Sequence, residues 1–258
     1  MARRYENESF AHVKKFCPVC DRKVEYFLHI GWDFIKELDE HGFIHSITNF
    51  ETFNLTEYFC PYCKSSDKER LYALFFKRFL KELAPESPVL EMIDFAPGDA
   101  LAHFFRTCKQ LNYFTTDIVK PGVDLFTDIT NMIDISSNSI DIFLCSHVVE
   151  HVKNDCKALS ELCRILKSGG LGVLMAPVLL NLDKTYENND INEDALRTKH
   201  FMQSDHFRVY SKKGFAELIE NAGFTFSAWG IDSFGENAFS LHGIHRRSVL
   251  YVLRKPRE

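Results

Sequence analysis

The chain has 258 residues, of which 45% are hydrophobic and 26% are charged, and its formal net charge is −5. This length allows one domain with a sizeable core and a small appendage. The negative net charge argues against sequence-independent binding of nucleic acid, because such binding needs Lys and Arg to neutralise the phosphates. The first ten residues lack the apolar core of a signal peptide, and the longest nearly apolar run, 170–180, is too short to span a bilayer. We therefore expect a cytoplasmic protein without a membrane span.

Two C-P-x-C segments near the N-terminus, 17–20 and 60–63, carry four of the eight cysteines. Each segment places two thiols on a tight turn, so four sulfurs can converge tetrahedrally on a zinc ion. Reduced turns or disulfides are the alternative, and the cytoplasm disfavours disulfides. Strand-like residues 25–30 and 43–53 predict a hairpin or small sheet between the pairs. We therefore predict a zinc-ribbon module over residues 1–64, whose structural zinc is held by Cys17, Cys20, Cys60 and Cys63.

A strand, a tight turn and a helix follow this module. A capping box at residues 66–69 (SDKE) opens a predicted helix, which ends before Pro85. Residues 89–95 are predicted as the first main strand, and residues 96–100 (APGDA) as a turn into a further helix. Small residues at such a turn let the backbone approach a ligand closely. Asp94 either faces that ligand with its carboxylate or serves as a cap or solvated loop acid.

The second predicted strand, residues 112–116, ends at Asp117. A carboxylate at the end of the second strand of an open α/β sheet is placed to accept hydrogen bonds from both ribose hydroxyls. Asp117 is therefore the candidate ligand of a ribose.

Residues 139–177 predict a strand, a helix and a second strand. Residues 140–145 form an apolar run, residues 156–166 carry a helical stripe, and Gly169-Gly170 is expected to stop that helix before residues 171–176. This βαβ order implies a parallel sheet. The polar cluster at residues 146–151 (SHVVEH) would lie at the carboxyl end of the first strand, where open α/β sheets bind ligands.

At these residues the chain resembles class I S-adenosylmethionine (SAM)-dependent methyltransferases, in which an HVLEHV-like segment is paired with L-K-x-G-G. The resemblance implies an α/β fold with a Rossmann-like, seven-stranded sheet over residues 65–258, and SAM as cofactor. Ala96, Gly98 and Ala100 stand where the family usually has three glycines. Residues 123–129 resemble the short third strand, where an acid and the next amide meet the adenine; a turn-forming role is the alternative for this acid. The implied SAM contacts are Asp94, Ala96, Pro97, Gly98, Asp117, Ile118, Asp128, Ile129 and Ser146.

A polar insert, residues 178–209, follows the fifth predicted strand and is expected to form a substrate lid. With its T-Y-E and Q-x-D-H-x-R-x-Y segments, the chain is similar to bacterial methyltransferases that carry an N-terminal zinc ribbon and are associated with surface-polysaccharide pathways. A guanidinium there suits a phosphate or carboxylate. The substrate-binding candidates are Tyr186, His200, Asp205 and Arg208.

Methyl transfer from a sulfonium is an in-line displacement, so the protein must supply alignment and, for a hydroxyl acceptor, a general base. Histidine suits this role because its pKa lies near neutral pH. His147, after the fourth strand, and His206, in the insert, are the catalytic candidates. A hydrogen-bonded structural role is the alternative for each.

These observations favour a SAM-dependent methyltransferase that O-methylates a small molecule, namely a sugar or phosphorylated precursor of a surface polysaccharide. A zinc-ribbon rRNA methyltransferase is an alternative, but residues 1–30 and 41–63 lack a dense cluster of Lys and Arg with interleaved aromatic residues. A non-catalytic SAM-fold binding protein is a second alternative, which the glycine-poor first turn supports.

Overall fold

The computed structural model of the protein describes residues 14–257. Its centre is a seven-stranded sheet in which β12 runs antiparallel to both of its neighbours and the strands from β7 to β5 are parallel. The predicted Rossmann-like α/β fold is confirmed. In spatial order the strands are β11 (Thr225–Trp229), β12 (Leu250–Arg254), β7 (Leu166–Met175), β6 (Ile140–Ser146), β3 (Leu90–Phe95), β4 (Leu111–Asp117) and β5 (Leu125–Phe126).

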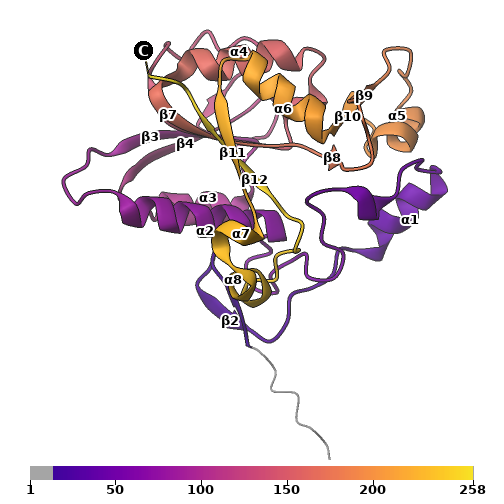
Figure 1. The fold of residues 1–258 in the computed structure, drawn as a ribbon, viewed down its shortest axis with the longest axis horizontal. Helices are drawn as coiled ribbons and strands as arrows, with labels where there is room; N and C mark the ends of the chain where they lie inside the picture. The colour runs from indigo at the N-terminus through magenta and orange to yellow at the C-terminus, as the bar shows by residue number, and fades with distance from the viewer. Residues whose placement is uncertain (1–13, 258) are drawn as a thin grey trace, which may run out of the picture.

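Helices cover both faces of this sheet (Figure 1). On one face lie α2 (Asp67–Glu82) and α3 (Asp99–Arg106), and on the other lie α4 (Asp155–Ile165) and α6 (Lys212–Asn221). Two short helices, α7 (Ile231–Phe234) and α8 (Glu236–Leu241), precede the last strand. Within residues 14–257 no helix combines the length and the apolar composition that crossing a bilayer requires.

Local sequence signals determine where α2 begins but not where α4 ends. The predicted capping box is present, because Ser66 Oγ accepts the Glu69 amide and Glu69 accepts the Ser66 amide. The expected glycine stop of α4 is wrong: the helix ends at Ile165, and Gly169-Gly170 lies inside β7. The register of β7 on β6 shifts there, since Ile140 pairs with Leu166 and Ile142 with Leu171. Gly169 and Gly170 therefore lie in a β-bulge of β7.

The residues between the two cysteine pairs form helices and not the expected hairpin or sheet. A hairpin of β1 (Lys15–Cys17) and β2 (Arg22–Val24) surrounds the first pair, while residues 25–30 make only an isolated bridge from Leu28 to Phe59. Beyond it lie α1 (Trp32–Glu40) and η1 (Ile47–Asn49). The expected strand over residues 43–53 is absent because Phe50 is buried against the insert and bridges its Leu179.

The insert is a small three-stranded sheet with one helix. Its strands follow the order β8-β10-β9, with β10 parallel to β8 and antiparallel to β9. Figure 1 shows α1 beside this unit. The two share a second core, which is separate from that of the main sheet and consists of Leu38, Phe50, Leu179, Ile191, Phe201, Met202 and Val209. The elements of the insert are β8 (Val178–Leu179), β9 (Tyr186–Glu187), α5 (Asp194–Phe201) and β10 (Arg208–Ser211).

One buried arginine ties the N-terminal segment to the main sheet. The side chain of Arg70, on α2, is fully buried, and its guanidinium lies 3.8 Å from the ring centroid of Phe27. Its N–H groups donate to backbone carbonyls of two segments that are distant in sequence. These acceptors are Glu57, Tyr58 and Ser65 beside the second cysteine pair, and His242 and Gly243 after α8.

We expect Arg70→Met to lower the free energy of unfolding by about 3–5 kcal/mol, because buried carbonyls lose their charged donor. Urea denaturation followed by circular dichroism measures this loss. Arg78→Met is the matched control on the same helix, since Arg78 forms an exposed ion pair with Glu82. Its replacement should cost less than about 1 kcal/mol, and equal losses for the two variants would contradict the prediction.

Candidate functional site

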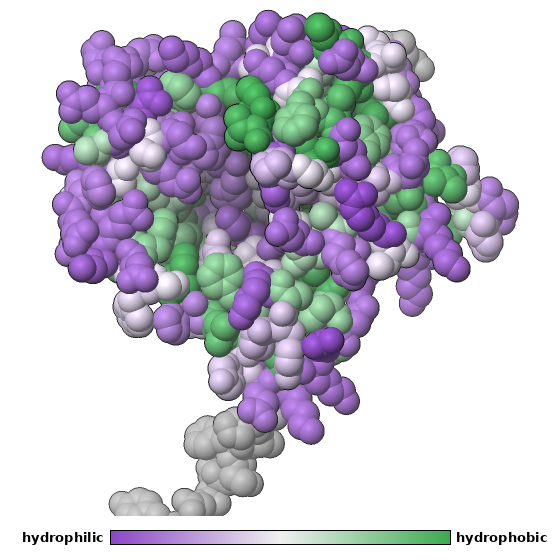
Figure 2. Space-filling model, turned by 180° about the vertical axis from the view of Figure 1, so that it is seen from behind, coloured by the Kyte–Doolittle hydropathy of each residue, from purple (hydrophilic) through white to green (hydrophobic). Residues whose placement is uncertain are grey.

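Three neighbouring cavities lie at the carboxyl ends of β3, β4 and β6. Parallel strands end at one edge of the sheet, so the residues that follow them converge there. The first cavity lies between this edge and the start of α2, the second lies beyond β4, and the third lies under α1; they measure about 300, 320 and 380 Å³. His147 lines all three. Figure 2, the face opposite to that of Figure 1, shows a hydrophilic surface with hydrophobic patches around a hollow.

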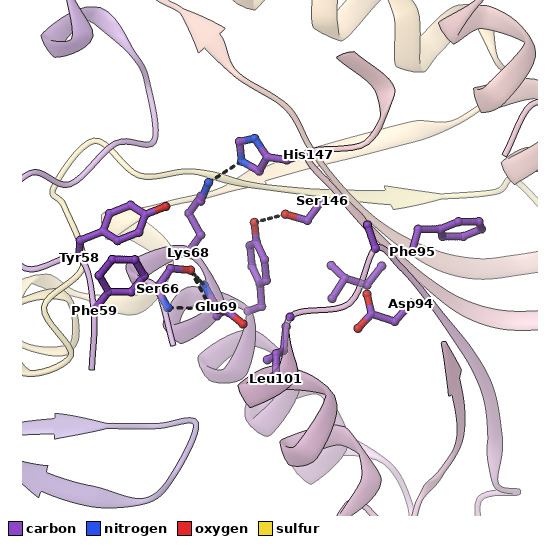
Figure 3. A pocket seen from close by; sticks show the side chains of 14 residues that line it. Tyr58, Phe59, Ser66, Lys68, Glu69, Asp94, Phe95, Leu101, Ser146 and His147 are labelled. Atoms are coloured by element: carbon purple, nitrogen blue, oxygen red, sulfur yellow. Dashed lines mark hydrogen bonds between the residues drawn. The ribbon is translucent and has the colours of Figure 1, made fainter. Parts of the chain in front are cut away.

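The first cavity combines charged groups of α2 with the turn after β3 (Figure 3). Lys68 and Glu69 line it, and so does Ser146, whose hydroxyl lies 2.8 Å from that of Tyr72. A Cβ on Gly98 would lie 2.3 Å from Glu69 Oε1, so a larger residue here would displace this carboxylate, which also forms the capping box. Ala96 stands at a usual glycine position and adopts the left-handed backbone with φ +52°, which glycine would adopt without strain.

Asp94 lines the same cavity from the end of β3. Its carboxyl group is 2% exposed and accepts a 2.7 Å hydrogen bond from the Tyr113 hydroxyl. Burial raises the pKa of Asp94 to about 7, although the Tyr113 bond lowers it. The carboxyl group is therefore poised to change its charge near neutral pH.

The second cavity contains the predicted ribose and adenine residues. Asp117 Oδ1 accepts the amides of Val119 and Lys120, both at 2.8 Å, and among residues 14–257 no donor contacts Oδ2. Asp128 Oδ1 caps its own turn by accepting the Thr130 amide and hydroxyl. Ile118 and Ile129 add apolar walls. Pro97 is the exception among the predicted contacts, because its side chain lines a separate depression beside Lys120.

His147 is held between a cation and an anion. Its Nε2 lies 2.9 Å from Lys68 Nζ and its Nδ1 lies 3.1 Å from Glu150 Oε1 (Figure 3 shows the Lys68 contact). Burial lowers the pKa of His147, and the charge of Lys68 lowers it further. The neutral ring therefore donates from Nδ1 to the Glu150 carboxylate and accepts at Nε2 from Lys68. The backbone of His147 is left-handed, with φ +57°, which turns this side chain into the space between the cavities.

His206 lies behind the cavity wall and not at its surface. It is fully buried, its Nδ1–H donates to the Phe201 carbonyl at 2.8 Å, and its ring packs edge-on against His151 at 4.4 Å. Burial lowers the pKa of His206 to about 4. The wall of the second cavity is formed by His151, whose Nδ1 lies 3.0 Å from Asp205 Oδ2. The structure therefore does not bring His206 into contact with any of the three cavities.

Of the four predicted substrate residues, the structure brings only Asp205 to these cavities. The Tyr186 hydroxyl is bonded to His200 Nδ1 at 2.7 Å, and the Tyr186 ring packs on the second core. Arg208 is buried, and its five N–H groups are taken by the side chain of Glu187 and by backbone carbonyls, so none is free for a substrate. Those carbonyls belong to Val149, Val152 and Lys153.

The third cavity is the part that sequence reasoning missed. Its aromatic lining comes from the segment between the cysteine pairs, while the insert supplies Met202 and Gln203. The sequence signal for this cavity was the density of aromatic residues in that segment. It was overlooked because the segment was interpreted as a strand. The lining aromatic residues are Phe34, Phe50, Phe53, Tyr58 and Phe59.

The four N-terminal thiols lie within 4.8 Å of one another. The Sγ atoms of Cys17 and Cys63 are 3.7 Å apart, and those of Cys20 and Cys60 are 3.9 Å apart. Tetrahedral coordination at a Zn–S distance of about 2.3 Å would separate the sulfurs by about 3.8 Å. The cluster therefore has the donors and the spacing of a four-sulfur metal site, and none of these cysteines lines the three cavities.

A family model described as "Methyltransferase domain" matches residues 66–228, which is more than half of the chain. The chain belongs to this methyltransferase family. The match covers the main sheet through β11 and includes the insert, so residues 14–65 lie outside it. No curated protein matches the chain significantly.

Solved structures with similar folds include three remote cases. The chain is 14% identical to the 1,6-didemethyltoxoflavin-N1-methyltransferase of Burkholderia thailandensis, with 73% of this chain and 78% of that chain covered and a TM-score of 0.47. It is 14% identical to a SAM-dependent methyltransferase of Archaeoglobus fulgidus, covering 74% and 95%, with a TM-score of 0.46. It is 12% identical to the [4+2]-cyclase SpnF, covering 73% and 83%, also with a TM-score of 0.46.

Proposed function

We propose that the protein is a SAM-dependent methyltransferase that methylates an oxygen atom of a small molecule held in the third cavity. The observation that carries this proposal is the meeting of three cavities at His147. SAM would extend from the second cavity into the first, which leaves its sulfonium beside His147. The acceptor would approach from the third cavity, on the other side of the same ring.

The first and second cavities hold residues that could bind the two ends of SAM, the methionine part and the adenosine part. The open Oδ2 of Asp117 would accept from the ribose, and the Asp128 turn with Ile118 and Ile129 would enclose the adenine. Asp94 would meet the methionine ammonium, while Ala96, Gly98 and Ser146 would let the backbone approach it. Pro97 would shape this turn through its backbone. The left-handed Ala96 supports a working SAM site, because it gives the turn the conformation that glycine supplies elsewhere in the family.

The lining of the third cavity supports a sugar or phosphorylated acceptor, such as a precursor of a surface polysaccharide. Aromatic rings stack on sugar and nucleoside rings, and Thr52 and Gln203 offer hydrogen bonds. Lys68 is the cation on this wall and would bind a phosphate or carboxylate. Asp205 lines the second cavity and not the third, so it would contact only an acceptor that reaches past His147 toward SAM.

We assign the general base to His147. When Lys68 turns to an anionic acceptor, His147 Nε2 loses its donor and is free to accept the acceptor's hydroxyl proton. Glu150 would hold the ring in position and stabilise the imidazolium that forms. The acceptor oxygen forms a bond to the methyl carbon while the C–S bond breaks, which yields the methylated product and S-adenosylhomocysteine.

The thiol cluster is proposed to hold a structural zinc ion in an N-terminal module over residues 1–64. Four thiolates fill a tetrahedral shell, so the ion would have no open position for catalysis. Cytoplasmic residence is the matching proposal, because thiols stay reduced there.

Asp117→Ala should weaken SAM binding by about 2–3 kcal/mol, the scale of hydrogen bonds to a charged group. Isothermal titration calorimetry with SAM measures this change. Asp99→Ala is the matched control, because the Asp99 side chain is 95% exposed and does not line the proposed SAM cavities. Undiminished affinity in Asp117→Ala would contradict the proposed SAM site.

SAM affinity should rise between pH 6 and pH 8. The SAM ammonium favours ionised Asp94, whose pKa burial raises to about 7, so below this pH binding must expel a proton. The affinity should fall by up to about tenfold per pH unit below 7. Calorimetry in buffers of different ionisation enthalpy measures how many protons are released when SAM binds. Asp94→Asn should abolish this proton release. An unchanged pH profile in that variant would exclude the Asp94 contact.

His147→Asn should lower turnover by about 100- to 10,000-fold while SAM affinity stays nearly unchanged. Asn tolerates the left-handed backbone at this position, which limits the damage to folding. Transfer of labelled methyl from SAM to a panel of sugar phosphates and sugar nucleotides measures turnover. Lys68→Met is the companion variant, and it should mainly raise KM for the anionic acceptors. Normal turnover in His147→Asn would assign the base elsewhere.

Protein purified without exposure to a chelator should contain about one zinc ion per chain, as measured by elemental analysis. Cys60→Ser should lose this zinc and unfold the N-terminal module before it affects SAM binding, because metal binding there is coupled to local folding. Cys156→Ser is the control, since this exposed thiol lies on α4. Zinc-free wild-type protein would refute the assignment.

A further inference from the structure

A second cluster of potential metal ligands lies at the carboxyl end of β6. Glu150 and His151 belong to η2 (Val149–His151), and His206 belongs to the loop before β10. One donor atom from each of the three side chains lies within 4.8 Å of the other two. The cluster is far from the thiols in sequence and has different donors, two imidazoles and a carboxylate.

Two of these potential ligand atoms are buried without any hydrogen-bond partner among the described residues. Glu150 Oε2 and His206 Nε2 are inaccessible, and no described donor or acceptor satisfies them. Since His206 Nδ1–H donates to the Phe201 carbonyl, Nε2 carries the lone pair of the neutral ring. A carboxylate oxygen and an imidazole lone pair are then buried near each other, which is unfavourable unless a cation lies between them.

Each ligand is also fixed by a second hydrogen bond. His147 Nδ1 lies 3.1 Å from Glu150 Oε1, the Phe201 carbonyl accepts from His206, and Asp205 contacts His151 Nδ1 at 3.0 Å. Metal-binding histidines are held in this manner by carboxylates or backbone carbonyls. The buried guanidinium of Arg208 adds rigidity, because it donates to the carbonyls of Val149 and Val152 at the two ends of η2.

A shared proton is the competing explanation of the paired acceptors. It would create an N–H···O bond or ion pair between His206 and Glu150, and the structure has neither within the residues described. A metal ion needs no such contact, since it binds both atoms from a position between them. The arrangement of the three side chains therefore fits an ion better than a proton.

We propose that Glu150, His151 and His206 bind a divalent transition-metal ion at the wall of the second cavity. Two imidazoles and one carboxylate suit ions such as Mn²⁺, Fe²⁺ or Zn²⁺ better than Mg²⁺ or Ca²⁺. Three protein ligands leave coordination positions open, and His151 and Asp205 place the ion beside the cavity. An acceptor that reaches past His147, which borders both the second and the third cavity, could place its oxygen at one of these positions, and the ion would then lower the pKa of its hydroxyl. This last step rests on the proposed function, whereas binding of the ion does not.

The test is titration with Mn²⁺ alone of the full chain holding no more than one zinc ion per chain, the amount that the four thiols take, followed by electron paramagnetic resonance and calorimetry without SAM or acceptor. Mn²⁺ prefers oxygen and nitrogen ligands to thiolates, so it reports this cluster and not the cysteines. We expect about one Mn²⁺ per chain, with binding at least tenfold weaker in His206→Asn and in Glu150→Gln. Asp205→Asn should weaken it by about 10- to 100-fold through the orientation of His151. His103→Asn, an exposed histidine on α3, should bind Mn²⁺ like the wild type.

Several outcomes overturn the proposal. Absence of saturable Mn²⁺ binding in the wild type refutes the site, and SAM binding in the same sample shows whether the proposed function stands without it. Unchanged Mn²⁺ affinity in His206→Asn also refutes it. If that variant fails to fold, His151→Asn replaces it, because this half-buried side chain lies at the cavity surface. Mn²⁺ binding that leaves methyl transfer unaffected would overturn the contact with the acceptor oxygen.

Discussion

The buried guanidinium of Arg70 is the interaction on which the arrangement of this molecule depends. A charged group in the interior is tolerable only when its donors are satisfied, and Arg70 finds its acceptors only where the second cysteine pair, α2 and the loop after α8 meet. This requirement fixes the N-terminal segment against the sheet edge. The aromatic side chains of that segment then form the wall of the third cavity.

The same edge explains why one residue lines all three cavities of the candidate site. Because the parallel strands all end there, the residue after the central strand β6 faces both halves of the cleft. His147 occupies this position, and its left-handed backbone turns the side chain between Lys68 and Glu150. Glu150 in turn links His147 with the His151 and His206 cluster. Lys68, His147 and Glu150 therefore form a hydrogen-bonded chain between the third cavity and the proposed metal site.

The main sheet, the capping box and the clustering of the four cysteines could be predicted from the sequence, because apolar runs, local caps and C-P-x-C spacing are local signals. The position of Asp117 followed from a strand end in the same way, whereas Asp128 was predicted from the resemblance of residues 123–129 to the family; both residues line the second cavity. Burial of polar side chains could not be predicted. Arg208 and His206 resemble ligand-binding residues in a linear pattern, yet partners distant in sequence enclose both. The helix α1 was missed because its apolar face pairs with the insert and not with a local strand.

The second core joins two segments that are distant in sequence, residues 38–50 and 179–209, as the bridge between Phe50 and Leu179 shows. Contacts of such long sequence separation carry a high loop-closure cost. Only seven buried side chains among the described residues form this core, and regions with few buried apolar contacts open at lower free energy than a large core. In the proposed function, transient separation of α1 from the insert would therefore admit a bulky acceptor while the main sheet and the proposed SAM site stay intact.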